Sequence, residues 1–282
     1  MNEHERELAV RRIVVALDAS PHSLAALEAA SELAGSMKAE LVGVYVEDIN
    51  LLNLAGLPFA REISYLSVAA RPLNSLSMER ELRMQAERIR TALAGVAERR
   101  QLRWSFRVVR GRVSTEILTA AQDADMLAIG RASAAMTRHI RLGTTAREVV
   151  SQIARPLLLL QHGHTICHPV QLVYDGSATA QRAMTTAVQM ALAAGGHLTV
   201  MIIADTLELA QRLREETTEH LQDQRIQGHY HQLITPTADE LAHALRGAGG
   251  GTLIMAADNP LLQGEGMSTL LEAIDCSVLL IR

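Results

Sequence analysis

Short apolar runs alternate along the chain with longer segments whose apolar residues recur at helical spacing. The short runs are typical of buried strands, and the longer segments are typical of helices that cover a sheet. Strands that alternate with helices predict right-handed βαβ crossovers and a parallel sheet covered on both faces. The predicted strands lie near residues 12–18, 40–47, 105–110, 125–130 and 156–161, and then near 170–175, 198–204, 229–234, 252–257 and 277–281. The predicted helices of the first half lie near residues 20–34, 75–100, 113–124 and 144–154.

The second half of the sequence repeats the pattern of the first. The segments RRIVVALDASPHSLAALEAASELAG (11–35) and PVQLVYDGSATAQRAMTTAVQMALAAGG (169–196) share an apolar run, an aspartate, a serine two places later and an Ala-rich helical pattern closed by glycine. The repeat predicts two tandem doubly wound α/β domains, each with a five-stranded parallel sheet and helices on both faces. We place these domains at residues 1–162 and 168–282, joined by the linker HGHTICHP (162–169).

Signals at the helix ends support this assignment. Ser20 and Ser177 stand where an N-cap hydroxyl would accept hydrogen bonds from the first free backbone amides. Gly35 and Gly195 stand where a left-handed C-cap is expected. Each half therefore begins with the same predicted strand, turn and helix.

Composition and charge narrow the classes of function. Aromatic residues make up 2% of the chain, which argues against stacking platforms for single-stranded nucleic acid. The formal net charge of −4 gives no general attraction to nucleic acid or anionic membranes. No apolar stretch approaches the roughly 18 residues of a membrane span, and the charged start MNEHERELAVRR is unlike a secretory signal. With only Cys167 and Cys276, which form no disulfide framework, we expect a cytoplasmic protein with no nucleic acid or membrane partner.

The segment IGRASAAMTRHIRLGTTAREVV (129–150) carries the strongest candidate chemistry. It follows a predicted strand and leads into a helix, at the sheet edge where ligands of doubly wound folds bind. Glycines let a backbone approach anionic oxygens closely, and a Gly-Thr-Thr helix start offers amides, hydroxyls and the positive end of the helix dipole. Arg131, Arg138 and Arg141 add positive charge. The segment is thus either a phosphate cradle or an ordinary βα connection with a helix cap.

These motifs resemble the universal stress protein family. The resemblance rests on VVALDAS at the first strand, AIG at the fourth, and the spacing G-x2-[G]-x9-G-[S/T], and it covers nearly the whole chain as two tandem Rossmann-like domains. It implies that Asp18 and Val46 lie by the ribose and adenine of ATP or another adenine nucleotide, with or without Mg²⁺. Ser133 replaces the family's middle glycine. The nucleotide-binding residues implied are Ala16, Asp18, Val46, Ile129, Gly130, Arg131, Ser133, Gly143, Thr144 and Thr145.

The second half departs from this glycine pattern. The step from Ala257 to Gly264 spans seven residues, whereas the step from Gly130 to Gly143 spans thirteen. Glu265 stands at the position that matches Thr144, and its negative charge would repel a triphosphate. We therefore predict a degenerate site in the second domain, with a structural or regulatory role.

Two further features concern partners. About 32 extra residues follow Asp48 in the first half, and such long excursions are often lids or segments that bind a partner protein. The last strands of the two halves, PLLLLQ and SVLLIR, are too apolar to stay exposed as sheet edges. We expect them to meet within the chain as an intramolecular pseudo-dimer, or to pair with a second chain in a homodimer.

No catalytic constellation is evident in the sequence, and the resemblance implies stress-linked nucleotide sensing more than turnover. The linker residues His162, His164, Cys167 and His168 are zinc-compatible, but their spacing matches no familiar finger, so no metal site is expected. The leading hypothesis is a stress-response protein that binds an adenine nucleotide in its first domain. Two alternatives remain: a nucleotide-free interaction scaffold, and a slow ATP hydrolase in which Asp18 acts near metal-bound phosphates.

Overall fold

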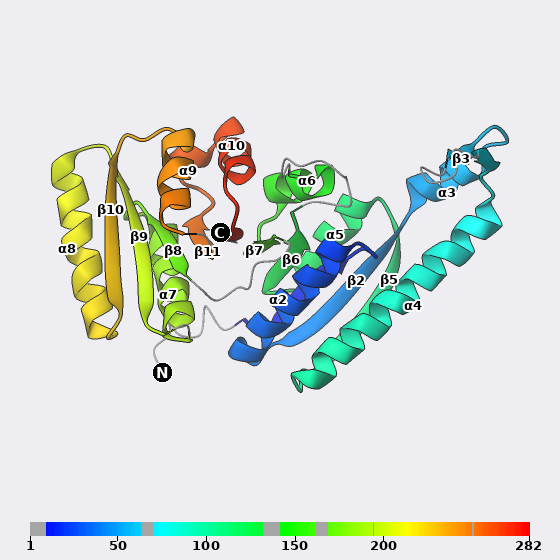
Figure 1. The fold of residues 1–282 in the computed structure, drawn as a ribbon, viewed down its shortest axis with the longest axis horizontal. Helices are drawn as coiled ribbons and strands as arrows, with labels where there is room; N and C mark the ends of the chain where they lie inside the picture. Colours follow the sequence, from blue (N-terminus) through cyan, green and yellow to red (C-terminus); the bar gives the residue numbers. More distant parts are fainter. Residues whose placement is uncertain (1–9, 64–69, 132–141, 162–168, 194, 250) are drawn as a thin grey trace.

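The computed structural model describes residues 10–63, 70–131, 142–161, 169–193, 195–249 and 251–282. Their long strands form one ten-stranded sheet in the order β10-β9-β8-β11-β12-β7-β6-β1-β2-β5 (Figure 1). The strands of the first half are β1 (Arg12–Leu17), β2 (Glu40–Asp48), β5 (Trp104–Gly111), β6 (Met126–Gly130) and β7 (Leu157–Leu160). Those of the second half are β8 (Val170–Tyr174), β9 (His197–Ala204), β10 (Gln227–Ile234), β11 (Thr252–Ala256) and β12 (Ser277–Ile281). Within each half all five strands are parallel, which confirms the predicted tandem α/β fold.

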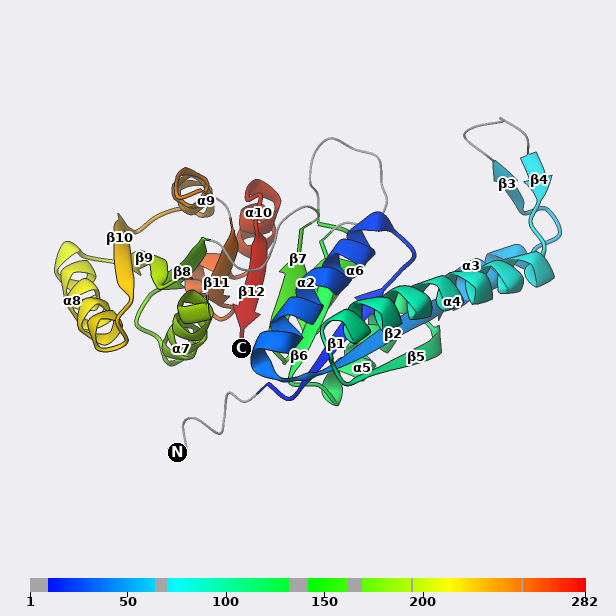
Figure 2. The ribbon, with the colours of Figure 1, turned by 60° about the horizontal axis from the view of Figure 1, so that its bottom comes forward.

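The two halves meet where β7 lies beside β12 (Figure 2). This pair is antiparallel, and Leu158 lies opposite Leu279. Every residue of both strands is buried, so the junction continues the sheet through the middle of the molecule. The expectation that the two apolar strands meet within the chain is confirmed.

Helices cover both faces of the sheet and build a core on each. One core contains buried side chains of the helices α2, α4, α7 and α8, and the other those of α5, α6, α9 and α10. Each core runs through both halves, because the sheet is continuous across the junction. These helices are α2 (Pro21–Met37), α4 (Ser75–Arg99), α5 (Val113–Gln122), α6 (Thr144–Gln152), α7 (Ala178–Ala193), α8 (Leu207–Asp223), α9 (Ala238–Gly247) and α10 (Glu265–Ala273), and a 3-10 turn, η1 (Pro260–Leu262), precedes α10.

The predicted helix ends are confirmed with one exception. The Ser20 and Ser177 hydroxyls each accept a hydrogen bond from a first-turn amide, and Gly195 has a φ of 95°. The C-cap predicted at Gly35 is wrong, because α2 continues to Met37 and ends at Lys38, whose φ is 55°. The Lys38 amide donates to the Gly35 carbonyl, and the next amide reaches back to the Ala34 carbonyl. This closure places the left-handed residue three positions beyond the glycine.

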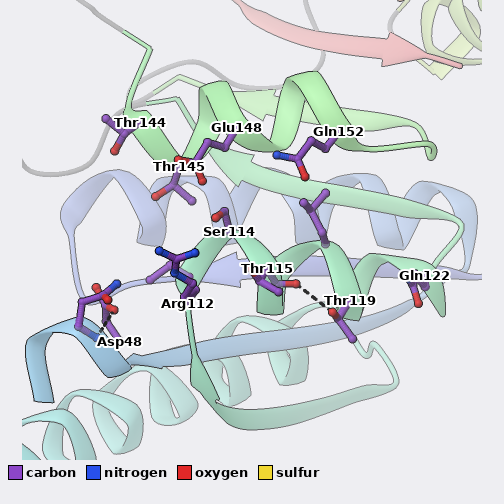
Figure 3. A pocket seen from close by; sticks show the side chains of 13 residues that line it. Asp48, Arg112, Ser114, Thr115, Thr119, Gln122, Thr144, Thr145, Glu148 and Gln152 are labelled. Carbon is purple, nitrogen blue, oxygen red and sulfur yellow. Dashed lines mark hydrogen bonds between the residues drawn. The ribbon is translucent and has the colours of Figure 1, made fainter. Parts of the chain in front are cut away.

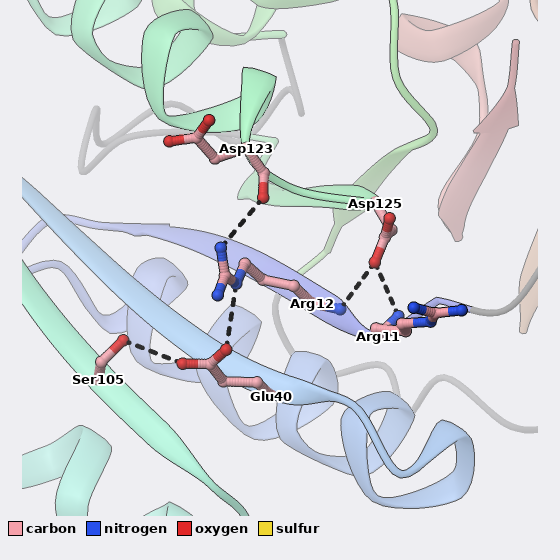
Figure 4. Close-up of polar contacts among 6 residues, drawn as sticks. All are labelled: Arg11, Arg12, Glu40, Ser105, Asp123 and Asp125. Atoms are coloured by element: carbon pink, nitrogen blue, oxygen red, sulfur yellow. Dashed lines mark hydrogen bonds and ion pairs between the residues drawn. The ribbon is translucent and has the colours of Figure 1, made fainter.

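Polar contacts fix the amino ends of the strands (Figure 4). The Asp125 carboxylate accepts hydrogen bonds from the main-chain amides of Arg11 and Arg12, at 2.8 and 3.0 Å. The Arg12 guanidinium forms an ion pair with Glu40 at 3.1 Å. These contacts tie the start of β1 to β2 and to the turn before β6. Because they lie at the end of the sheet opposite to the ligand-binding edge, we interpret them as structural.

The extra segment after β2 forms an arm that projects beyond the sheet (Figure 2). The arm consists of α3 (Ile49–Ala55), the paired short strands β3 (Arg61–Ile63) and β4 (Ala70–Pro72), and the start of α4. It exposes apolar side chains, among which Phe59 is 76% exposed and Leu76 is 67% exposed. The arm therefore leaves apolar surface without cover from the described residues.

Candidate functional site

A cleft of about 440 Å³ opens at the carboxyl ends of β1, β2 and β6. The chain passes from β1 to β2 on one side and from β5 to β6 on the other, so this edge is the topological switch point of the first half. Pockets of this size accommodate small organic ligands. The predicted site residues that line the cleft are Ala16, Asp18, Val46, Ile129, Gly130, Arg131, Gly143 and Thr145.

Apolar side chains form much of the cleft wall. Val113 and Ile117 of α5 line it together with the predicted residues Ala16, Val46 and Ile129. Such a wall suits a flat, weakly polar ring that leaves water on binding. The cleft thus offers an apolar compartment next to the sheet edge.

Tyr45 and Gln85 supply polar groups to the same cleft from the face of the sheet that α2 and α4 cover. The Tyr45 hydroxyl lies 3.0 Å from Gln85 Oε1 and donates to it. Burial, and then the negative charge of Glu47, raises the pKa of Tyr45 to about 12. The phenol therefore stays neutral and acts as a hydrogen-bonding group.

Asp18 organises the turn between β1 and α2. Its Oδ1 accepts hydrogen bonds from the amide and the hydroxyl of Ser20, the N-cap residue. Among the described residues, Asp18 Oδ2 accepts no hydrogen bond, and the side chain is exposed at the cleft. Asp18 therefore holds its turn and also presents one carboxylate oxygen to a ligand.

A polar groove of about 730 Å³ adjoins the cleft between α5 and α6 (Figure 3). Asp48, Val113 and Thr145 line both hollows, so the two are neighbours. Thr144, the remaining described residue of the predicted site, lines the groove near the start of α6. Ser133, Arg138 and Arg141 lie outside the described residues.

The groove also contains Arg112, which the sequence interpretation missed. Arg112 is the N-cap residue of α5, as Gly143 is of α6, and no side chain caps either helix within the described part of the chain. Free first-turn amides and the helix dipole favour an anion at both helix starts. The position of Arg112 directly before a predicted helix was the signal that could have found it.

The structure changes two expectations about the glycine loop. The Gly143 amide is not free, because it donates to the Arg131 carbonyl at 2.9 Å. The Arg131 side chain adds no charge to the cleft, because its guanidinium donates to the main-chain carbonyls of Ile274 and Cys276 in the second half. The residue following a strand end can send its side chain either way, and here the packing of the two halves sets its direction.

The universal stress protein family model matches residues 9–161. The chain belongs to the universal stress protein family. A universal stress protein from Archaeoglobus fulgidus superimposes with a TM-score of 0.74 and 17% identity, over 98% of this chain and 97% of that one. A functionally unknown protein from Pseudomonas aeruginosa PAO1 gives a TM-score of 0.63 and 13% identity, over 98% and 94% of the two chains. No curated protein matches the sequence.

In the second half of this universal stress protein, the matching edge is occupied by its own side chains. Asp175, the counterpart of Asp18, accepts hydrogen bonds on both oxygens, from the Ser177 amide at 2.9 Å and from Asn259 Nδ2 at 2.6 Å. Glu265 is the first residue of α10, where its charge takes the place of an external anion. The internal contacts agree with a degenerate second site.

The described residues hold no cluster of metal ligands, no helix that could span a membrane, and one buried cysteine. They contain no group of three or more His, Cys, Asp or Glu side chains arranged to hold a metal ion. None of their helices has the length and apolar character needed to cross a membrane. Burial raises the pKa of the Cys276 thiol to about 11, so this cysteine stays protonated and unreactive.

Proposed function

We propose that the N-terminal half binds ATP or another adenine nucleotide, with the base and ribose in the cleft and the phosphates along the groove. The observation that carries this proposal is that an apolar cleft and a polar groove adjoin each other at one topological switch point. The cleft has apolar walls, and the groove receives two helix starts without side-chain caps. A nucleotide has the same division into an apolar ring and an anionic tail.

In the cleft, the base would pack against Val46 and Ile129, the apolar residues at the ends of β2 and β6. The free oxygen of Asp18 would accept a hydrogen bond from a ribose hydroxyl, since a carboxylate is a strong acceptor. The hydrogen-bonded Tyr45 and Gln85 would form the polar end of this compartment. Each contact uses a group that the fold already holds in place.

In the groove, the phosphates would lie between Arg112 and the start of α6. The Thr144 and Thr145 amides and hydroxyls would donate to phosphate oxygens, and the dipoles of both helices would add to the positive potential. Mg²⁺ that accompanies ATP would be held mainly by phosphate oxygens and water.

The C-terminal half, which we assign to residues 168–282, would serve as a structural or regulatory partner of the nucleotide domain at residues 1–162. Its internal Asp175–Asn259 contact engages the carboxylate oxygen that corresponds to the free oxygen of Asp18. Family membership supports a role in a stress response, which we place in the cytoplasm. Within one chain the two halves would act as a pseudo-dimer with a single nucleotide site.

Titration calorimetry on the full chain with ATP and with adenosine tests this arrangement. Arg112→Gln and Thr144→Ala should each weaken ATP binding by about 1.5–3 kcal/mol, the usual contribution of a hydrogen bond to a charged group. Adenosine binding should not change, because adenosine has no phosphates to reach the groove. Arg155→Gln is the matched control, since Arg155 is also exposed but lines neither hollow. An equal loss for ATP and adenosine would contradict the placement of the phosphates.

A protein-binding scaffold is the second candidate, and the arm is the observation that favours it. Phe59 and Leu76 expose apolar surface at the far end of the molecule, away from the junction of the two halves. Exposed apolar patches of this kind mark surfaces that bind other proteins. If the protein is a scaffold that binds no nucleotide, the same calorimetric titration should show no heat of ATP binding. The titration therefore distinguishes the two functions.

A further inference from the structure

Arg131 is a cation inside the protein. Its side chain is 1% exposed, although the residue directly follows the end of β6 at the cleft. Nη1 contacts Gln161 Oε1 and the Ile274 carbonyl at 2.9 Å, and the Cys276 carbonyl at 3.1 Å. Two of these three acceptors belong to the second half, in the segment that leads into β12.

Within the described residues, the rest of the guanidinium has no hydrogen-bond partner. Nε and Nη2 are buried and make no hydrogen bond, and no carboxylate of the described residues lies within ion-pair distance. Burying a charge without a paired anion carries a large desolvation penalty. The fold therefore retains Arg131 at a cost in stability, which is typical of a residue that serves function.

The main chain of Arg131 belongs to the nucleotide site. Its amide donates to the Leu160 carbonyl of β7, and its carbonyl accepts from the Gly143 amide, both at 2.9 Å. Gly143 is the N-cap residue of α6, beside the proposed phosphate contacts. One residue thus links the start of α6, the last strand of the first half and the segment before β12.

The repeat itself does not demand this link. The position that matches Arg131 in the second half is Asp258, whose carboxylate accepts from the Thr179 hydroxyl at 2.7 Å within its own half. Two further arginines reach across the junction: Arg147 forms an ion pair with Glu272 at 2.7 Å, and Arg282 donates to the Val150 carbonyl. Neither of them lines the cleft or the groove. Only Arg131, among the described arginines that cross the junction, also lines the cleft.

We propose that Arg131 couples the nucleotide site to the C-terminal half. A ligand that contacts Gly130, Gly143 and the start of α6 restrains the main chain of Arg131. This restraint stabilises the hydrogen bonds from the Arg131 guanidinium to the Ile274 and Cys276 carbonyls. Coupling between two sites is reciprocal. If the ligand strengthens the contact of Arg131 with the C-terminal half by some factor, that contact raises the affinity of the cleft for the ligand by the same factor. The degenerate half would so act as a built-in regulator of the site. This inference rests on the proposed function.

Hydrogen exchange and calorimetry on the full chain test the coupling, with ATP as the probe. In the wild type, ATP should slow amide exchange at residues 274–277, which lie on the far side of the junction from the cleft. Arg131→Met keeps the aliphatic stem but removes every donor, and it should abolish this slowing and weaken ATP binding about tenfold, within the usual range of allosteric coupling. Arg147→Gln, which removes the Arg147–Glu272 ion pair across the junction, should preserve both the slowing of exchange and the ATP affinity.

The outcomes separate the two proposals. If the wild type binds ATP but exchange at residues 274–277 does not change, the coupling is overturned and nucleotide binding stands. The same conclusion follows if Arg131→Met binds ATP as the wild type does. If the wild type binds no ATP, both proposals fail. The wild-type exchange measurement needs no variant, so the test holds even if Arg131→Met does not fold.

Discussion

Val46→Trp should abolish ATP binding, whereas Ile203→Trp should leave it intact. Val46 lies near the end of β2 and lines the cleft, and an indole at this position would fill the space proposed for the base. Ile203 is the residue at the matching position of β9, and it is half-buried, as Val46 is. Tryptophan is well tolerated in strands, so both variants should fold. We expect Val46→Trp to reduce ATP affinity by more than about a hundredfold, or roughly 2.7 kcal/mol.

Calorimetric titration of both full-length variants with ATP and adenosine measures this effect. Val46→Trp should lose both ligands, because it blocks the base and not the phosphates. This pattern differs from that of Arg112→Gln, which should lose affinity for ATP alone. If Ile203→Trp were the damaging variant, the nucleotide would have to bind in the second half, and the reading of Asp175 and Glu265 would be wrong.

Leu158→Ala should lower the free energy of unfolding by about 2–5 kcal/mol, the range for large-to-small substitutions in a packed core. Leu158 is 0% exposed and lies in β7, opposite Leu279 of the second half. Its loss leaves a cavity at the strand pair that joins the halves. Leu192→Ala is the matched control, because Leu192 is 50% exposed on α7 and its truncation should cost about 0.5 kcal/mol or less.

Equilibrium urea unfolding with circular dichroism and with the single tryptophan, Trp104, measures both variants. Circular dichroism reports on the whole chain, whereas Trp104 lies in β5, at the edge of the first half. Because each core continues across the junction, both probes should report the same loss of stability for Leu158→Ala. Equal midpoints for Leu158→Ala and Leu192→Ala would refute the structural importance of the β7–β12 pair.

The sequence predicted the main sheet and the helices that cover it because local and global signals agree, but it did not predict the elements α3, β3 and β4 of the arm. The inner strands are short apolar runs, and the helices that cover the sheet have apolar residues at helical spacing, so their positions follow from burial. The edge strands β5 and β10 are more polar. The repeat then supplied the tandem arrangement, and the apolar character of PLLLLQ and SVLLIR indicated that these strands are buried. The likeness between the turns at Asp18 and Asp175 also follows from sequence, since each aspartate accepts from the serine amide two residues later.

The candidate site was predictable as far as it lies on strand ends. Ala16, Val46, Ile129 and Gly130 line the cleft because parallel strands bring their carboxyl ends to one edge, whatever the side chains do. The residue missed was Arg112, which contributes through the start of a helix on the opposite wall of the groove. Its position directly before a predicted helix was a local signal, but its place on the groove wall depends on how α5 packs beside α6.

By itself, the sequence determined where the strands of the main sheet lie, that the chain contains two copies of one fold, and that the first copy alone keeps the glycine spacing. Only the tertiary structure decided which groups are available. It showed that the Gly143 amide is already bonded, that Asp18 keeps one free oxygen, and that Arg131 turns into the second half. The physical reason for this division is that the spacing of apolar residues, which predicts strands and helices, depends only on near neighbours along the chain. The direction of a side chain and the partner of a polar atom depend instead on residues that are far apart in sequence. Arg131 and Cys276 are such a pair, and they meet only when both halves have packed.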